Sequence, residues 1–140
     1  KFLNTPEFKG DFMHYIKTAN APEAIGPYSQ AISHNGLVYT SGSIALRPNG
    51  DFVNGDIKAQ TEQVMQNLGA ILKEADSSLE CVLKTTCFLA NIDDFATFNE
   101  VYLKAFGSHK PARSTVAVKT LPKNALIEIE CIATTKEKFK

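Results

Sequence analysis

The stretch that decides the fold reads Pro111-Ala112-Arg113-Ser114-Thr115-Val116-Ala117-Val118-Lys119-Thr120-Leu121-Pro122. Proline cannot donate to a sheet ladder, so the two prolines mark the ends of one strand, and the β-branched residues between them favour extended backbone. Side chains alternate along a strand, which places Arg113, Thr115 and Ala117 on one face. The sequence therefore predicts a strand that carries a guanidinium among small residues.

Arg113 is a candidate ligand for a carboxylate. A guanidinium can hold a planar carboxylate through two parallel hydrogen bonds, which the ammonium of a lysine cannot do. Many arginines instead form surface or interfacial ion pairs, and the residue alone leaves both roles open. The next strand-like segment contains two glutamates that favour the role of carboxylate ligand.

That segment, Leu126-Ile127-Glu128-Ile129-Glu130, places both glutamates on one face and both isoleucines on the other. If the isoleucines pack under helices, Glu128 and Glu130 lie on the helix-free face, where we also expect Arg113. Either glutamate could merely neutralise a lysine or Arg113 itself. Together with the arginine, however, they predict a cleft with an anion clamp and a base that orients water.

The composition is that of an ordinary globular domain, with 44% hydrophobic and 21% charged residues. Fifteen basic and fifteen acidic residues give a formal net charge of zero, so no overall positive field recruits nucleic acid or an anionic membrane. The three cysteines and three histidines lack the spacing of a disulfide framework or a metal site. No apolar run approaches the roughly 20 residues of a membrane helix. We expect a soluble protein of a reducing compartment that needs no metal or cofactor.

The remaining segments define an α+β domain. Asp56 is a candidate N-cap for an amphipathic helix from Ile57 to about Ala75, and Asp93 or Asp94 for a second helix that ends at Gly107. Strand-like segments lie around these helices: His14–Thr18, Tyr28–Ser33, Leu37–Ser43, Val82–Leu89 and Ala125–Thr134. We interpret residues 1–12 as a vector-derived remnant or a trimmed leader, and residues 13–140 as one domain.

Two helices can cover only one face of a sheet of about six strands. The other face is predicted to carry Val38 or Tyr39, Arg113, Thr115 and Ala117. An uncovered sheet face with apolar residues needs a partner, and a second copy of the chain is the simplest one.

Four motifs in this order resemble the RidA (YjgF/YER057c/UK114) family of reactive-imine deaminases: Ile25-Gly26-Pro27-Tyr28-Ser29-Gln30, Tyr39-Thr40-Ser41-Gly42, Pro111-Ala112-Arg113-Ser114-Thr115-Val116 and Ile127-Glu128-Ile129-Glu130. The resemblance extends from about Tyr15 to Thr134. It implies a chorismate-mutase-like homotrimer, with a six-stranded mixed sheet, two helices on one face, and sites at the subunit interfaces.

The resemblance also implies an activity, the hydrolysis of 2-iminobutanoate and 2-iminopropanoate to 2-keto acids and ammonia. This reaction would spare pyridoxal-phosphate enzymes from damage by 2-aminoacrylate. Arg113, with the backbone N–H of Thr115, would bind the carboxylate, and Glu128 would orient the attacking water. Tyr28, Ser41, Gly42 and Asn99 would line the pocket. Ser43 departs from the glutamine common at this position, which leaves the side-chain preference open.

Two other functions remain alternatives to the deaminase. A non-catalytic sensor of small carboxylates would use the same arginine. A ribonuclease or translation inhibitor agrees less well with the balanced charge and the scattered histidines. We expect a cytosolic protein, with the mitochondrion as the alternative, and neither a membrane nor a nucleic acid is an expected partner.

Overall fold

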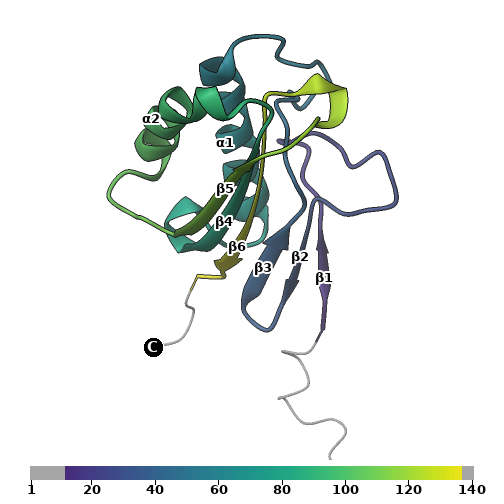
Figure 1. Cartoon of the computed structure of the whole chain (residues 1–140). Coiled ribbons are helices and arrows are strands. Elements are labelled where there is room, and N and C mark those ends of the chain that lie inside the picture. Colours follow the sequence, from purple (N-terminus) through teal and green to yellow (C-terminus); the bar gives the residue numbers. More distant parts are fainter. Residues whose placement is uncertain (1–11, 137–140) are drawn as a thin grey trace, which may run out of the picture.

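The computed structural model describes residues 12–136, and these form one six-stranded mixed sheet with two helices (Figure 1). The strands are β1 (His14–Ile16), β2 (Ala31–His34), β3 (Leu37–Thr40), β4 (Val82–Leu89), β5 (Ala112–Ala117) and β6 (Ile127–Thr134). Their order across the sheet is β1-β2-β3-β6-β4-β5. Strands β4 and β5 are parallel, and every other neighbouring pair is antiparallel.

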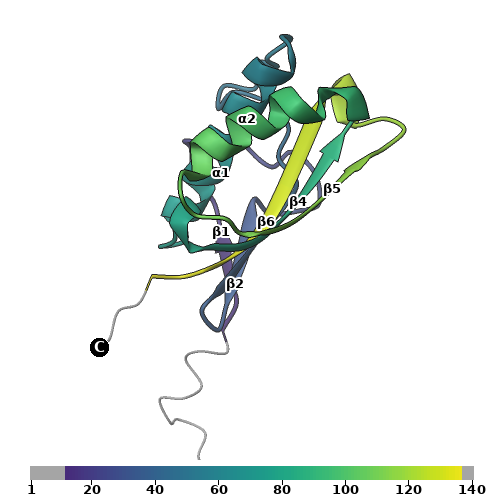
Figure 2. The same cartoon turned by 60° about the vertical axis from the view of Figure 1, so that its left-hand side comes forward.

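The helices α1 (Ile57–Glu74) and α2 (Phe95–Phe106) lie on the same side of the sheet, as Figure 2 shows. Strand β4 connects them in sequence, and α2 then returns the chain to β5, parallel to β4. Three short 3₁₀ turns complete the described part of the chain: η2 (Leu79–Cys81), η3 (Ile92–Asp94) and η4 (Pro122–Asn124). The α+β class and the two-helix layer predicted from the sequence are confirmed.

Local sequence explains where the helices begin and end. The Asp56 carboxylate accepts a hydrogen bond from the Ala59 N–H at 2.9 Å, which caps α1 as predicted. Gly107 ends α2 with φ of 66°, a conformation that favours glycine. The N-cap prediction for α2 was wrong in detail, because the Asp94 side chain makes no capping bond. Instead Asn91 accepts the N–H of Asp93 and caps η3, which leads into α2.

The core fills the space between the helices and the sheet. Apolar side chains from one face of each helix meet the alternate residues of β6 and β4, and the members with essentially no solvent exposure include Val64, Leu68, Leu72, Leu89, Phe98, Ile127 and Ile129. Burial along β6 alternates as expected, with Ile127 and Ile129 inside and Glu128 and Glu130 on the opposite face. This alternation fixes which side chains of the last strand can reach a ligand.

One predicted strand is longer than the element that the structure describes, and the interpretation of residues 1–12 stays a prediction. The strand expected over residues 111–122 is shorter, because the ladder of β5 ends at Ala117 and the chain turns away before η4. Except for Phe12, the segment interpreted as a remnant or leader lies outside the described residues. Within residues 12–136, no helix has the length and apolar character required to cross a membrane.

Candidate active site

Arg113 lies on the helix-covered face of the sheet, and the prediction that it lies on the open face was wrong. Its Nη1 donates to Oδ1 of Asn99 on α2 at 2.7 Å. The guanidinium carbon lies 4.7 Å from the ring centre of Tyr102 and 5.5 Å from that of Phe95. In the register of β4 and β5, Arg113 is paired with Thr85, a buried residue of the core face.

Thr115 and Ala117 share this face with Arg113. They are paired in register with Cys87 and Leu89, which are both fully buried in the core. The expectation that these two residues lie on the open face was therefore also wrong. Tyr39, one of the two candidates on β3, does lie on the open face, where it is 45% exposed.

The physical reason is that α2 offers the guanidinium a better environment than the open face. Aromatic rings attract a cation through their π faces, and a guanidinium is weakly hydrated compared with an ammonium. β5 is the edge strand, and the Arg113 side chain there remains partly exposed. Among residues 12–136, no carboxylate forms an ion pair with Arg113. Its guanidinium is held by a hydrogen bond to the neutral Asn99 amide and by contacts with aromatic rings.

One backbone donor of β5 near Arg113 in sequence, the N–H of Thr115, faces away from β4. The N–H of Val118 donates to the carbonyl of Leu89 on β4 at 2.9 Å. Backbone groups of successive strand residues point to opposite edges, so the N–H of Thr115, three residues earlier, faces the free edge of the sheet. A pocket of about 360 Å³ adjoins this edge and is lined by residues that include Asn99, Tyr102 and Arg113. We call Asn99, Arg113 and Thr115 the arginine half-site.

Glu128 belongs to a second pocket, of about 450 Å³, whose lining includes Tyr28, Ser41 and Gly42. Backbone hydrogen bonds between Ser43 and Ile129, at 2.9 and 3.1 Å, hold the segment after β3 against β6. Gly42 consequently packs directly on the Glu128 side chain. We call Tyr28, Ser41, Gly42 and Glu128 the glutamate half-site.

Gly42 and the Glu128 carboxylate are in close contact. An added Cβ would meet Oε2 of Glu128 and would lie 2.8 Å from its Cδ and 3.1 Å from its Cγ. A larger residue at position 42 would therefore displace the carboxylate from its present position, and the glycine is not there to supply a left-handed backbone angle.

Burial is the main factor that raises the pKa of Glu128 above its ordinary value, and the negative charge of Glu130 on the same strand raises it further. The neighbouring hydroxyls differ in availability. Ser41 Oγ donates to the carbonyl of Ser29 at 2.6 Å, so its proton is committed and only its lone pairs face the pocket. The Tyr28 side chain is 53% exposed and is free to contact a ligand.

The two half-sites do not meet within one chain. Arg113 is on the helix-covered face and Glu128 on the opposite face, and the two pockets share no lining residue. The structure thus divides the predicted residues into two sets, and it does not form the single cleft that a shared face would have given. A site containing both sets requires two chains.

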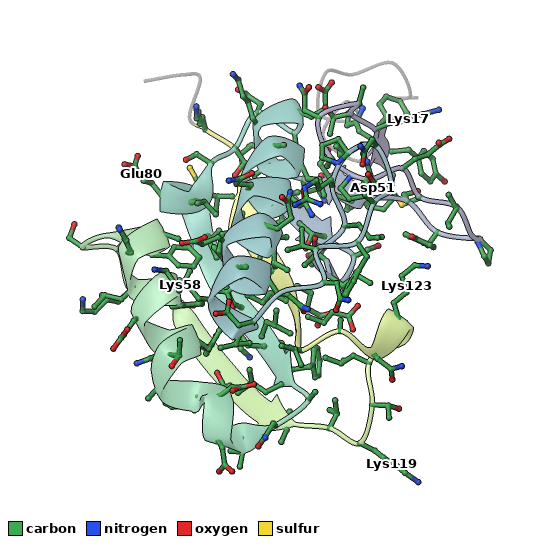
Figure 3. The ribbon with its side chains drawn as sticks, turned by 90° about the horizontal axis from the view of Figure 1, so that it is seen from above. Lys17, Asp51, Lys58, Glu80, Lys119 and Lys123 are labelled. Atoms are coloured by element: carbon green, nitrogen blue, oxygen red, sulfur yellow. The ribbon has the colours of Figure 1, made fainter. Side chains whose placement is uncertain are left out.

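Some residues of both half-sites were not anticipated from the sequence. Tyr102 and Phe95 form the aromatic wall behind Arg113, and the aromatic stripe of the helix was the available signal. Glu23 and Lys123 line the pocket of Glu128, but nothing in the sequence indicates that these distant loops meet. In Figure 3 the Lys123 side chain extends from η4 toward the N-terminal loops, whereas Lys119 points away from the molecule. Within residues 12–136, no three His, Cys, Asp or Glu side chains are grouped as a metal site would require.

The chain belongs to the endoribonuclease L-PSP family, whose model matches residues 18–135. The fold and the predicted RidA resemblance agree with this assignment. AldR of Lactococcus lactis, named as a regulator, is 58% identical over 89% of this chain and 99% of its own. Reactive Intermediate Deaminase A of Arabidopsis thaliana, named as chloroplastic, is 52% identical over 85% of this chain and 64% of its own. The human 2-iminobutanoate/2-iminopropanoate deaminase is 46% identical over 84% and 87%, respectively.

Solved structures share the fold. A crystal structure from Entamoeba histolytica, described as an endoribonuclease L-PSP, has a TM-score of 0.86 and 53% identity over 88% of this chain and 99% of its own. Escherichia coli TdcF with bound serine has a TM-score of 0.83 and 39% identity over the same shares. Family members that resemble this chain therefore include named deaminases. Since one of them is chloroplastic, the compartment of this protein stays a prediction.

Proposed function

We propose that the protein hydrolyses 2-iminobutanoate and 2-iminopropanoate, at sites formed where the arginine half-site of one subunit meets the glutamate half-site of a neighbour in a homotrimer. The observation that carries the proposal is the state of Arg113. Its guanidinium is ordered by Asn99 and by aromatic rings, is partly exposed, and has no carboxylate partner among residues 12–136. An arginine held in this way is prepared to bind an incoming carboxylate.

The chemistry needs positioning more than activation. Arg113 retains N–H donors beyond the one bound to Asn99, and the outward N–H of Thr115 adds another, so a substrate carboxylate can be held at several points. The carbon of the protonated imine is already electrophilic. Water adds to this carbon while a carboxylate takes one of its protons, and the carboxylic acid returns that proton to the nitrogen. The C–N bond then breaks as the new hydroxyl group loses its proton, which gives the 2-keto acid and ammonia, with the proton taken up as ammonium. Holding the reactants in place can supply about 7 to 11 kcal/mol in the best intramolecular cases.

Glu128 is suited to the role of base. A general base works best when its pKa is close to the working pH, and burial shifts the pKa of Glu128 in that direction. Gly42 limits the movement of the carboxylate on one side. The base therefore has both a raised pKa and a restricted position.

The open face of the sheet supports the assembly. Tyr39 and Val116, on the face opposite the helices, are 45% and 46% exposed although both are large and apolar. β5 also leaves alternate backbone groups unpaired at the sheet edge. A second copy of the chain would cover this surface, and it would bring a second set of half-sites to the first.

The relatives support the reaction and also an alternative. Two of them are named as deaminases, and the TdcF structure is described as having bound serine, a small amino acid with a carboxylate. AldR is named as a regulator, which favours the alternative of a carboxylate sensor that uses the same arginine.

The test couples a threonine dehydratase, which releases the enamine precursor of 2-iminobutanoate, to the protein and follows loss of the imine. We expect acceleration by the wild type, none by Arg113→Ala, and reduced turnover by Glu128→Gln with binding of 2-ketobutanoate retained. Arg47→Ala and Glu62→Gln, which change exposed residues outside both half-sites, are the matched controls and should equal the wild type. Binding of 2-ketobutanoate without acceleration would identify a sensor, and RNA cleavage retained by Arg113→Ala without imine hydrolysis would identify a nuclease.

A further inference from the structure

Asn67 on α1 is a buried amide that donates hydrogen bonds to backbone carbonyls outside its own helix. Its side chain is 1% exposed. Nδ2 donates to two backbone carbonyls, those of Leu46 at 2.8 Å and of Ile44 at 3.3 Å. Oδ1 accepts from Nε2 of Gln63 at 3.0 Å, one turn earlier on the helix. Both ends of the amide are therefore engaged, and two of its three bonds hold a loop.

The loop that Asn67 holds is one wall of the glutamate half-site. Residues 41–46 follow β3 without forming a regular strand, and five of these six residues line the pocket of Glu128: Ser41, Gly42, Ser43, Ile44 and Leu46. The paired backbone bonds of Ser43 and Ile129 fix the loop to β6. The amide of Asn67 fixes its far end to α1.

We propose that Asn67 is a positioning residue that holds the 41–46 loop in place and, through Gly42, fixes the Glu128 carboxylate for its work on water. This inference rests on the proposed function for its catalytic consequence, but the mechanical link stands on the contacts alone. Gly42 has no space between itself and Glu128, since an added Cβ would lie 2.8 Å from Cδ of that residue. A shift of the loop by even a few tenths of an ångström therefore changes the space that the carboxylate occupies.

The consequence for Glu128 can be given a direction. A loosened loop admits water to the carboxylate, and less burial lowers its pKa toward the ordinary value. Other charges around Glu128 stay in place: Glu130 on β6, and Glu23 and Lys123 from the pocket rim. Arg113 belongs to the other half-site, so carboxylate binding should not change. Loss of Asn67 should therefore lower kcat while KM is preserved.

The experiment compares Asn67→Leu and Asn67→Ala with Thr61→Val. Thr61 is also fully buried on α1, but its hydroxyl bonds only to the carbonyl of Ile57 within the helix, which makes it a matched control. Three quantities are measured: amide hydrogen exchange across residues 41–46, the titration of the Glu128 carboxyl by carbon NMR, and kcat and KM as functions of pH.

For the Asn67 variants we expect faster exchange in the loop, a lower pKa of Glu128, an acid limb of the kcat profile moved to lower pH, and kcat reduced by about 10- to 100-fold with KM within about twofold of the wild type. Thr61→Val should match the wild type in all of these. The proposal would be overturned if Asn67→Leu had the same amide exchange in residues 41–46 and the same pKa of Glu128 as the wild type. A changed KM with an unchanged kcat would also overturn it.

Two further arrangements keep the test decisive. If both Asn67 variants fail to fold, Gln63→Ala replaces them, because it removes the bond to Oδ1 from a partly exposed helical position. It should shift exchange and titration in the same direction by a smaller amount, and no shift would overturn the proposal. If the wild type does not accelerate imine hydrolysis, the proposed function fails, whereas exchange and titration still decide whether Asn67 fixes Glu128.

Discussion

Mixing Arg113→Ala chains with Glu128→Gln chains should raise activity above that of either variant alone, because Arg113 and Glu128 lie in separate pockets on opposite faces of one chain. Arg113→Ala chains keep an intact glutamate half-site, and Glu128→Gln chains keep an intact arginine half-site. In randomly mixed oligomers, a given site draws an intact arginine half-site with a probability of one half and an intact glutamate half-site with the same probability. The mixture should therefore show about one quarter of the wild-type activity per chain.

The assay co-expresses the two variants, or refolds them together, and measures imine hydrolysis in the dehydratase-coupled reaction. The fraction of activity retained in a second mixture tests the same question independently. When the double variant Arg113→Ala/Glu128→Gln is mixed in equal amount with wild-type chains, sites drawn from two chains retain about one quarter of the activity, whereas sites within single chains retain about one half. No recovery in the first mixture, together with one half in the second, would refute the two-chain site.

Three other perturbations test single contacts. Gly42→Ala should displace the Glu128 carboxylate and lower kcat roughly tenfold, while the free energy of unfolding in urea changes by less than about 1 kcal/mol because only a flexible side-chain end must move. Because the pKa of Glu128 is raised in the folded state, the free energy of unfolding of the wild type should fall as pH rises from the ordinary value of 4.5 through the folded-state value. Glu128→Gln lacks this titration, so its stability relative to the wild type should increase over the same pH range. Parallel curves of stability against pH for the two proteins would contradict this. Tyr102→Phe should cost about 1 to 3 kcal/mol in urea unfolding, because the buried Thr85 hydroxyl loses its partner at 2.7 Å, and KM should stay unchanged because the ring beside Arg113 remains.

The sequence was sufficient for most of the fold because its local signals agreed with one another. The apolar spacing from Ile57 onward and the aromatic spacing from Phe95 to Phe106 predicted both helices within about a residue of their observed ends. The dense apolar run over Val82–Leu89 matches β4. The predicted neighbouring segments Tyr28–Ser33 and Leu37–Ser43 contain β2 and β3, which are joined by a tight hairpin turn in which Asn35 and Gly36 have φ of 52° and 81°.

The face of Arg113 could not be predicted from alternation. The period of two fixes which residues share a face, but it does not fix which face the helices cover. We assumed that a charged side chain avoids the helices, whereas the aromatic rings and Asn99 of α2 hold the guanidinium beneath the helix at the sheet edge. The contacts of Asn67 and Lys123 escape sequence reasoning for another reason. They join segments far apart in the chain, and local periodicity carries no information on such pairs.

Under the proposed function, the placement of the two half-sites on opposite faces would make activity depend on association between chains. In the proposed assembly, a freshly made subunit would be inert until it met its neighbours, so specific activity would fall steeply once the protein was diluted below the dissociation constant of the assembly. The rate in the cell would then rise more steeply than in proportion to the concentration of the protein, until the assembly is fully formed.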